Sequence, residues 1–190
     1  MANGEFLATL DKRGRLTVFV LKSNRYAVVR RGGAHGLALK FSLQQRCECF
    51  VSLENGKIEC FNTETKTLVG VLKGHSRGAR SLACHPHRPV LASAAPDAVI
   101  LWSTAQLTKL RVLSTPPSRS LQGAIFAPDG LTFATLFERG VTMWDLQSFR
   151  SRGSLQLPLS TEQTQSMLSI AISYDSTLGE RNPHSASLLA

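Results

Sequence analysis

Three side chains near the middle of the chain have the residue types of a hydrolytic site. His75, Ser93 and Asp97 supply an imidazole, a hydroxyl and a carboxylate, and Trp102 follows them. A serine nucleophile needs a neighbouring base and a sharp turn that exposes its hydroxyl, whereas Ser93 lies inside the apolar run "VLASA" with no G-x-S-x-G motif. The same groups can satisfy one another in a buried structural network, because an indole N–H needs an acceptor. We therefore expect a structural polar network of His75, Ser93, Asp97 and Trp102, and no enzyme activity.

The sequence "CHPH" places Cys84, His85 and His87 together, which are metal-ligand types. A zinc site needs a second pair of ligands at a suitable spacing, and none follows. The chain has four cysteines: Cys47, Cys49, Cys60 and Cys84. Cys47 and Cys49 are too close along the chain for a useful bridge, so we expect buried, reduced thiols, no metal and no cofactor.

Composition limits the function classes. The chain has 190 residues, of which 43% are hydrophobic, and it carries a net charge of +9. Every apolar run is shorter than the roughly 20 residues of a membrane span, and the mixed-charge N-terminus does not resemble a signal peptide, so we expect an intracellular protein. The charge favours acidic partners, which include nucleic acid, but no basic run alternates with aromatic residues as in RNA-binding motifs.

Aromatic residues recur at a fixed spacing along the chain. Phe19, Phe61, Trp102 and Trp144 are separated by 42, 41 and 42 residues. Each anchor closes a strand-like run, and each run follows a turn ("DKRG", "ENG", "APD" or "ERG") with another apolar run before it. Further runs complete four short strands per unit. Four strands in a unit of about 42 residues are typical of a β-propeller blade of WD-repeat type.

The repeat predicts an all-β fold, a β-propeller of WD-repeat type with about four and a half four-stranded blades in an incomplete ring. The expected blades cover about 1–31, 32–73, 74–115 and 116–157. Residues 158–166 resemble a linker, and 167–190 resemble a partial fifth blade with a divergent end, for which disorder is one expectation. The first unit starts at its second strand. Closed rings have about four to eight blades, so a part of a longer chain, self-association into a composite ring and a four-bladed ring all remain open.

The repeats also carry a more specific likeness. The stretches concerned are "ALKFSL" (38–43), "FVSL" (50–53), "IECFNTETKTLV" (58–69), "GH" (74–75) and "LW" (101–102). They resemble the N-terminal WD-repeat region of the centriolar-satellite and cilium members of the TBC-domain family. In such blades the positions of His75, Ser93, Asp97 and Trp102 hold a polar network.

The resemblance implies an adapter in cilium biogenesis that bridges centriolar and ubiquitin-ligase-associated proteins. It also implies a cytoplasmic location at the centrosome, the centriolar satellites or the cilium basal body. No arginine-finger or glutamine-finger motif of a Rab GTPase activator is visible in the sequence.

A blade scaffold presents its loops at both ends, so partner contacts are expected in turns. The candidate contacts are four turn arginines: Arg77, Arg80, Arg88 and Arg139. The leading hypothesis is a non-catalytic protein-interaction scaffold. The alternative is a basic propeller that binds nucleic acid or an acidic partner in a generic WD-repeat complex.

Overall fold

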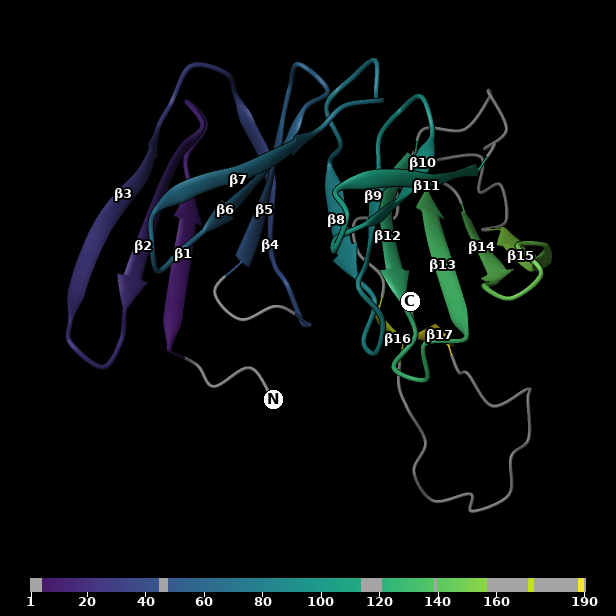
Figure 1. Ribbon diagram of the computed structural model, residues 1–190. Helices are drawn as coiled ribbons and strands as arrows, with labels where there is room; N and C mark the ends of the chain where they lie inside the picture. Colours follow the sequence, from purple (N-terminus) through teal and green to yellow (C-terminus); the bar gives the residue numbers. More distant parts are fainter. Residues whose placement is uncertain are drawn as a thin grey trace.

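The computed structural model describes residues 5–44, 48–113, 121–138, 140–156, 171–172 and 188–189. Within these ranges the chain consists of antiparallel strands and the turns between them, with no helix and therefore no helix that could span a membrane. Consecutive stretches of chain form separate sheets that stand next to one another (Figure 1). The expected all-β propeller architecture of WD-repeat type is thereby confirmed.

Four sheets, called blades 1 to 4 here, make up most of the described chain. Blade 1 has three strands: β1 (Phe6–Leu10), β2 (Arg15–Val20) and β3 (Arg25–Arg31). Blade 2 has four: β4 (Gly36–Phe41), β5 (Glu48–Leu53), β6 (Ile58–Asn62) and β7 (Thr67–Leu72). Blade 3 contains β8 (Ser81–Cys84), β9 (Val90–Ala94), β10 (Val99–Ser103) and β11 (Thr108–Leu113). Blade 4 contains β12 (Leu121–Phe126), β13 (Thr132–Phe137), β14 (Gly140–Asp145) and β15 (Ser151–Gln156).

The chain after blade 4 is described only in part. The expected linker, 158–166, lies outside the described residues. Two short strands, β16 (Ala171–Ile172) and β17 (Leu188–Leu189), pair with each other within the region expected to hold a partial fifth blade. Ile172 packs against Ala134, Leu136 and Val141 of blade 4.

Each blade is a meander in which neighbouring strands pair in sequence order, because short turns join them. Gly14 and Gly56 take positive φ angles of 75° and 80° in the turns before β2 and β6, a conformation that glycine adopts without strain. In blades 2, 3 and 4 the pairing of the last two strands shifts register directly before the aromatic anchor. The anchor therefore recurs in the same local geometry in these three blades.

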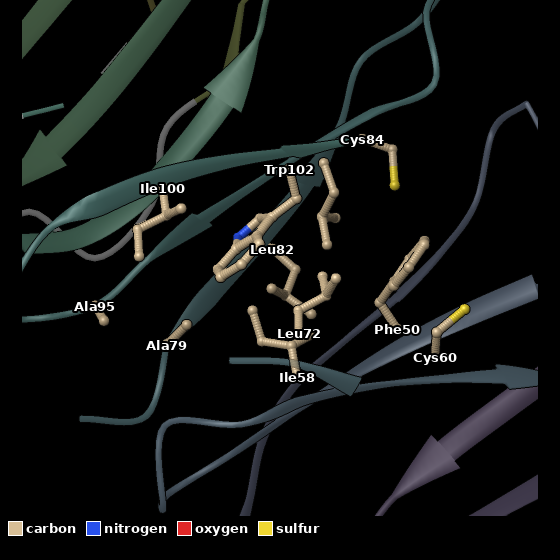
Figure 2. Close-up of a cluster of buried hydrophobic side chains, with 11 residues drawn as sticks. Phe50, Ile58, Cys60, Leu72, Ala79, Leu82, Cys84, Ala95, Ile100 and Trp102 are labelled. Carbon is tan, nitrogen blue, oxygen red and sulfur yellow. The ribbon is translucent and has the colours of Figure 1, made fainter. Parts of the chain in front are cut away.

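The blades pack face to face through apolar side chains. Between blades 2 and 3, Phe50, Ile58 and Cys60 face Trp102 and neighbouring side chains of blade 3 (Figure 2). Blade 3 packs against blade 4 through another buried cluster, which includes Val99 and Phe133, and blade 1 packs against blade 2 through a third. In this way the anchor-bearing face of one blade covers the opposite face of the blade before it.

The loops lie at two ends of the blades. We call one of them the connector end: it holds the connectors between blades (32–35 and 73–80) and the turns 11–14, 54–57 and 95–98. Backbone hydrogen bonds join these loops, from Gly33 N to Arg13 O at 3.3 Å and from Glu54 N to His35 O at 2.9 Å. The opposite end holds the turns between the first and second and between the third and fourth strands of a four-stranded blade, which include 85–89 and 127–131.

Candidate functional site

The structure brings His75, Ser93, Asp97 and Trp102 together in blade 3. His75 lies in the connector before the blade, Ser93 is in β9, Asp97 is in the following turn and Trp102 is in β10. The indole N–H of Trp102 donates to Ser93 Oγ at 2.8 Å. Ser93 Oγ lies 2.6 Å from His75 Nε2, and His75 Nδ1 lies 3.1 Å from Asp97 Oδ1.

The carboxylate of Asp97 determines which groups donate and which accept in this network. A carboxylate only accepts, so His75 Nδ1 carries the proton that faces Asp97, and Nε2 accepts the Ser93 O–H. The backbone N–H of Ser76 donates to Asp97 Oδ2 at 2.8 Å. Burial lowers the pKa of His75 below its usual value, against the opposite effect of Asp97. Burial alone would raise the pKa of Asp97, but the bonds from Ser76 and His75 outweigh it and hold the pKa below its usual range.

The Ser–His–Asp series has the hydrogen-bond order of a hydrolase triad, but a substrate cannot reach its serine hydroxyl. Ser93 is 0% exposed and Trp102 is 1% exposed. The Ser93 oxygen already accepts a hydrogen bond from Trp102, and the residue lies in the middle of a strand instead of at an exposed turn. The arrangement satisfies buried polar groups and fixes the position of the connector against the sheet.

A shorter version of the network occurs in blade 4. The indole N–H of Trp144 donates to Thr135 Oγ1 at 2.9 Å, and Thr135 Oγ1 donates to Thr142 O at 3.3 Å. Thr135 is 0% exposed. The spacing of hydroxyl and indole is the same in both blades, which is a signal that the sequence offers but that we did not use to predict Thr135.

The residue after the anchor caps a turn. Asp145 Oδ1 accepts from the backbone N–H of Gln147 at 3.0 Å and of Ser148 at 2.6 Å. Bonds from the Ser148 N–H and O–H and from the Arg152 guanidinium lower the pKa of Asp145 to about 2. Asn62 caps the equivalent turn of blade 2 by accepting from Glu64 N and Thr65 N, both at 2.9 Å. These residues shape turns and are not free for ligand chemistry.

The residues of "CHPH" are engaged separately. His85 Nδ1 accepts from the backbone N–H groups of His87 and Arg88, both at 3.0 Å, so Nε2 carries the proton and donates to Gly130 O at 3.0 Å. Burial lowers the pKa of His85. Cys84 Sγ lies 3.2 Å from Phe41 O. Among the described residues, no group of three or more His, Cys, Asp or Glu side chains could hold a metal ion.

The three described cysteines are free and buried: Cys49, Cys60 and Cys84. Burial raises the pKa of Cys49 and of Cys60 to about 12, and that of Cys84 to about 11. The thiols are therefore protonated at neutral pH and are poor nucleophiles. Cys47 lies outside the described residues.

The four candidate contact arginines do not form one group. Arg77 and Arg80 are exposed in the connector 73–80, at the connector end. Arg88 is exposed in the turn 85–89, at the opposite end of the blade. Arg139 lies outside the described residues.

A largely buried ion pair between blades was not predicted. Arg30 Nε of β3 lies 2.6 Å from Glu59 Oε2 of β6, and the two side chains are 12% and 17% exposed. Arg30 also donates from Nη1 to Gly14 O at 2.6 Å. The pair joins blade 1 to blade 2 across 29 residues of sequence, a separation at which no local pattern announces a contact.

The chain is similar in sequence to several known proteins, although not to a family model. No family model matches the chain. TBC1 domain family member 31 of Homo sapiens is 28% identical over 156 residues, which are 82% of this chain and 15% of that protein. The protein of the same name from Bos taurus is 28% identical over 158 residues, which are 83% of this chain. This chain therefore spans about one seventh of the length of these relatives, since the aligned part is 15% of each.

Other similarities are consistent with the repeat type. WD repeat-containing protein VIP3 of Arabidopsis thaliana is 29% identical over 53% of this chain and 32% of its own length. A chain in the crystal structure of the Mitotic Checkpoint Complex superposes with a TM-score of 0.70, at 18% identity, over 87% of this chain and 52% of that chain. The chain is thus an arc of a WD-repeat β-propeller, and its sequence is similar to TBC1 domain family member 31.

Proposed function

We propose that the chain is a non-catalytic protein-interaction scaffold. The observation that supports this most strongly is the use of its polar groups. The histidine, serine and aspartate that have the types of a catalytic site are buried or partly buried and satisfy one another and Trp102. The exposed groups include loop residues such as Arg77 and Arg80, which the packed blades hold in fixed positions.

We further propose that it acts as an adapter in centrosome and cilium biogenesis, in the cytoplasm at centriolar satellites or the basal body. The support is the sequence similarity to TBC1 domain family member 31 over 82% of the chain. In this role it bridges centriolar or ubiquitin-ligase-associated proteins. Propellers suit bridging because loops at two ends of the same blades can engage two partners.

Proximity labelling tests the adapter role. The chain is fused to a biotin ligase and expressed in ciliated cells, with the ligase alone as control. The proposal predicts enrichment of centriolar and basal-body proteins over the control. Labelling confined to nuclear or ribosomal proteins would contradict it.

The net charge of +9 supports nucleic-acid binding as a second candidate. Phosphate contacts of this kind weaken steeply with salt, so an anisotropy titration with labelled single-stranded DNA at several salt concentrations tests it. Undetectable binding at physiological salt would eliminate this candidate.

A further inference from the structure

Two arginines lie directly opposite each other at the connector end of blade 1. Arg15 of β2 and Arg31 of β3 are paired across the strands, and both are exposed. Together with Val28 they line a shallow hollow. Like charges in directly opposed positions disfavour a sheet unless an anion lies between them. In the part of the chain that the structure describes, neither arginine forms an ion pair.

The same positions are cationic in blade 2. Lys57 and Lys73 directly flank the paired residues Ile58 and Leu72 at the corresponding ends of β6 and β7, and both lysines are exposed. Lys57 and Lys73 are exposed even though blade 1 packs on the face of blade 2 that carries them. A second blade packed against Arg15 and Arg31 would therefore leave these arginines accessible in the same way.

The cationic positions continue into the next connector. A Cβ added at Gly56 would contact the backbone of His75 and Arg77, so the turn before β6 lies against the connector that carries Arg77 and Arg80. We call this series the cationic strip: Arg15, Arg31, Lys57, Lys73, Arg77 and Arg80. It follows the connector end from blade 1 to blade 3.

Two of the three acidic groups along the strip, Asp11 and Asp97, accept hydrogen bonds from the loops, whereas the Glu54 side chain is 67% exposed. Asp11 Oδ1 accepts from the Arg15 backbone N–H at 2.7 Å. Asp97 binds His75 and Ser76, and Glu54 lies 3.5 Å from His35. Asp11 and Asp97 therefore satisfy loop and imidazole groups, and among the described residues none of the three carboxylates forms an ion pair with the guanidinium and ammonium groups of the strip.

We propose that the cationic strip binds an extended, Asp- and Glu-rich segment of a partner protein. Carboxylates match arginine in charge and geometry, and a strip along successive loops suits an extended chain. The loops 11–14, 32–35, 54–57, 73–80 and 95–98 contain no Phe, Tyr or Trp on which bases could stack, which favours a peptide over single-stranded nucleic acid. This inference rests on the proposed scaffold function and names its partner class.

The test is fluorescence anisotropy with a labelled peptide of twelve alternating Asp and Glu residues, at physiological salt. R15Q/R31Q and K57Q/K73Q are each expected to weaken binding about tenfold, since each removes two charged contacts. The control R88Q/R150Q removes the same charge at the opposite end and is expected to change the Kd less than about twofold, because screened charges far from the ligand contribute little. Thermal unfolding of each variant verifies that the fold is kept.

Three results would overturn the proposal: no binding of the peptide, equal weakening by the control variant, or tighter binding of a single-stranded oligothymidine of equal charge. The peptide-binding test of the strip and the labelling test of the adapter role can fail independently. Peptide binding without centriolar labelling would leave the strip in place and remove the cilium assignment. Centriolar labelling without peptide binding would do the reverse.

Discussion

Trp102 donates its indole N–H to the Ser93 hydroxyl at 2.8 Å, and the acceptor lies nine residues before its donor. The same separation of nine residues joins Trp144 to Thr135 one blade later. The aromatic anchor of a blade is thus held by a hydroxyl on the neighbouring strand. A residue pattern that resembles a hydrolase site serves to position the strands and the connector of the blade.

The substitution S93A tests this role. It leaves the Trp102 N–H and His75 Nε2 without a partner in a buried site, which costs on the order of 1–3 kcal/mol per unsatisfied group. We expect the free energy of unfolding in urea to fall by about 2–4 kcal/mol, and by less for T135V, where only one indole loses its partner. A loss for T135V as large as for S93A would contradict the account.

The buried histidines predict that acid destabilises the fold. The pKa values of His75 and His85 are lowered in the folded chain, so as the pH falls below the unfolded value of about 6.5 the unfolded chain binds protons that the folded chain does not. Stability is therefore complete above that pH and is lost progressively below it, until the folded pKa values are reached.

Chemical denaturation at a series of pH values measures this effect. Each histidine contributes a slope of up to about 1.4 kcal/mol per pH unit, so H85N is expected to remove about half of the decline between pH 6.5 and 5. H35N is the control, because His35 is exposed and outside both hydrogen-bond systems. A slope that H85N leaves unchanged would exclude His85 as a source.

The inter-blade pair of Arg30 and Glu59 is expected to stabilise the packing of blade 1. R30M leaves the Glu59 carboxylate unpaired and largely buried, and the free energy of unfolding should fall by about 2–3 kcal/mol. The comparison pair, Lys22 with Glu5, lies at 2.7 Å; its glutamate is 16% exposed, much like Glu59, but its lysine side chain is 76% exposed where Arg30 is 12% exposed. K22M should cost less than about 1 kcal/mol in the same urea titration. Equal effects of R30M and K22M would show that burial of the cation does not matter here.

Two turn residues at equivalent positions should respond in opposite directions to glycine. Lys66 and Leu107 have positive φ angles of 61° and 54°, which strain a residue with a side chain. Lys66 is exposed, so K66G should raise the free energy of unfolding by about 0.5 kcal/mol through relief of strain. Leu107 packs against the cluster between blades 2 and 3, beside Gly70, so L107G should lower it by about 2 kcal/mol. Stabilisation by L107G would contradict this packing role.

The repeat made the fold predictable because each blade is a local meander. The anchors Phe19, Phe61, Trp102 and Trp144 mark strands whose partners lie a few residues away, so spacing alone indicates the sheet. The same holds for the grouping of His75, Ser93, Asp97 and Trp102, which all belong to one repeat.

Contacts between blades were not predictable in this way. Arg30 and Glu59 are 29 residues apart, and His85 and Gly130 are 45 apart. Such pairs depend on how two finished sheets face each other, and the residue types alone do not select them from the other arginines and histidines. Arg77 and Arg80 lie at the other end of the blade from Arg88, and this separation likewise depends on which end each turn occupies.

We propose that the polar network builds the scaffold while the loops at the connector end bind the partner. Proximity labelling and thermal unfolding of the S93A and R77Q/R80Q variants test it together, at a temperature where both remain folded. The account predicts that S93A lowers the Tm but keeps the labelling pattern, and that R77Q/R80Q loses labelled partners at an unchanged Tm. Loss of labelling in folded S93A, with full labelling in R77Q/R80Q, would contradict it.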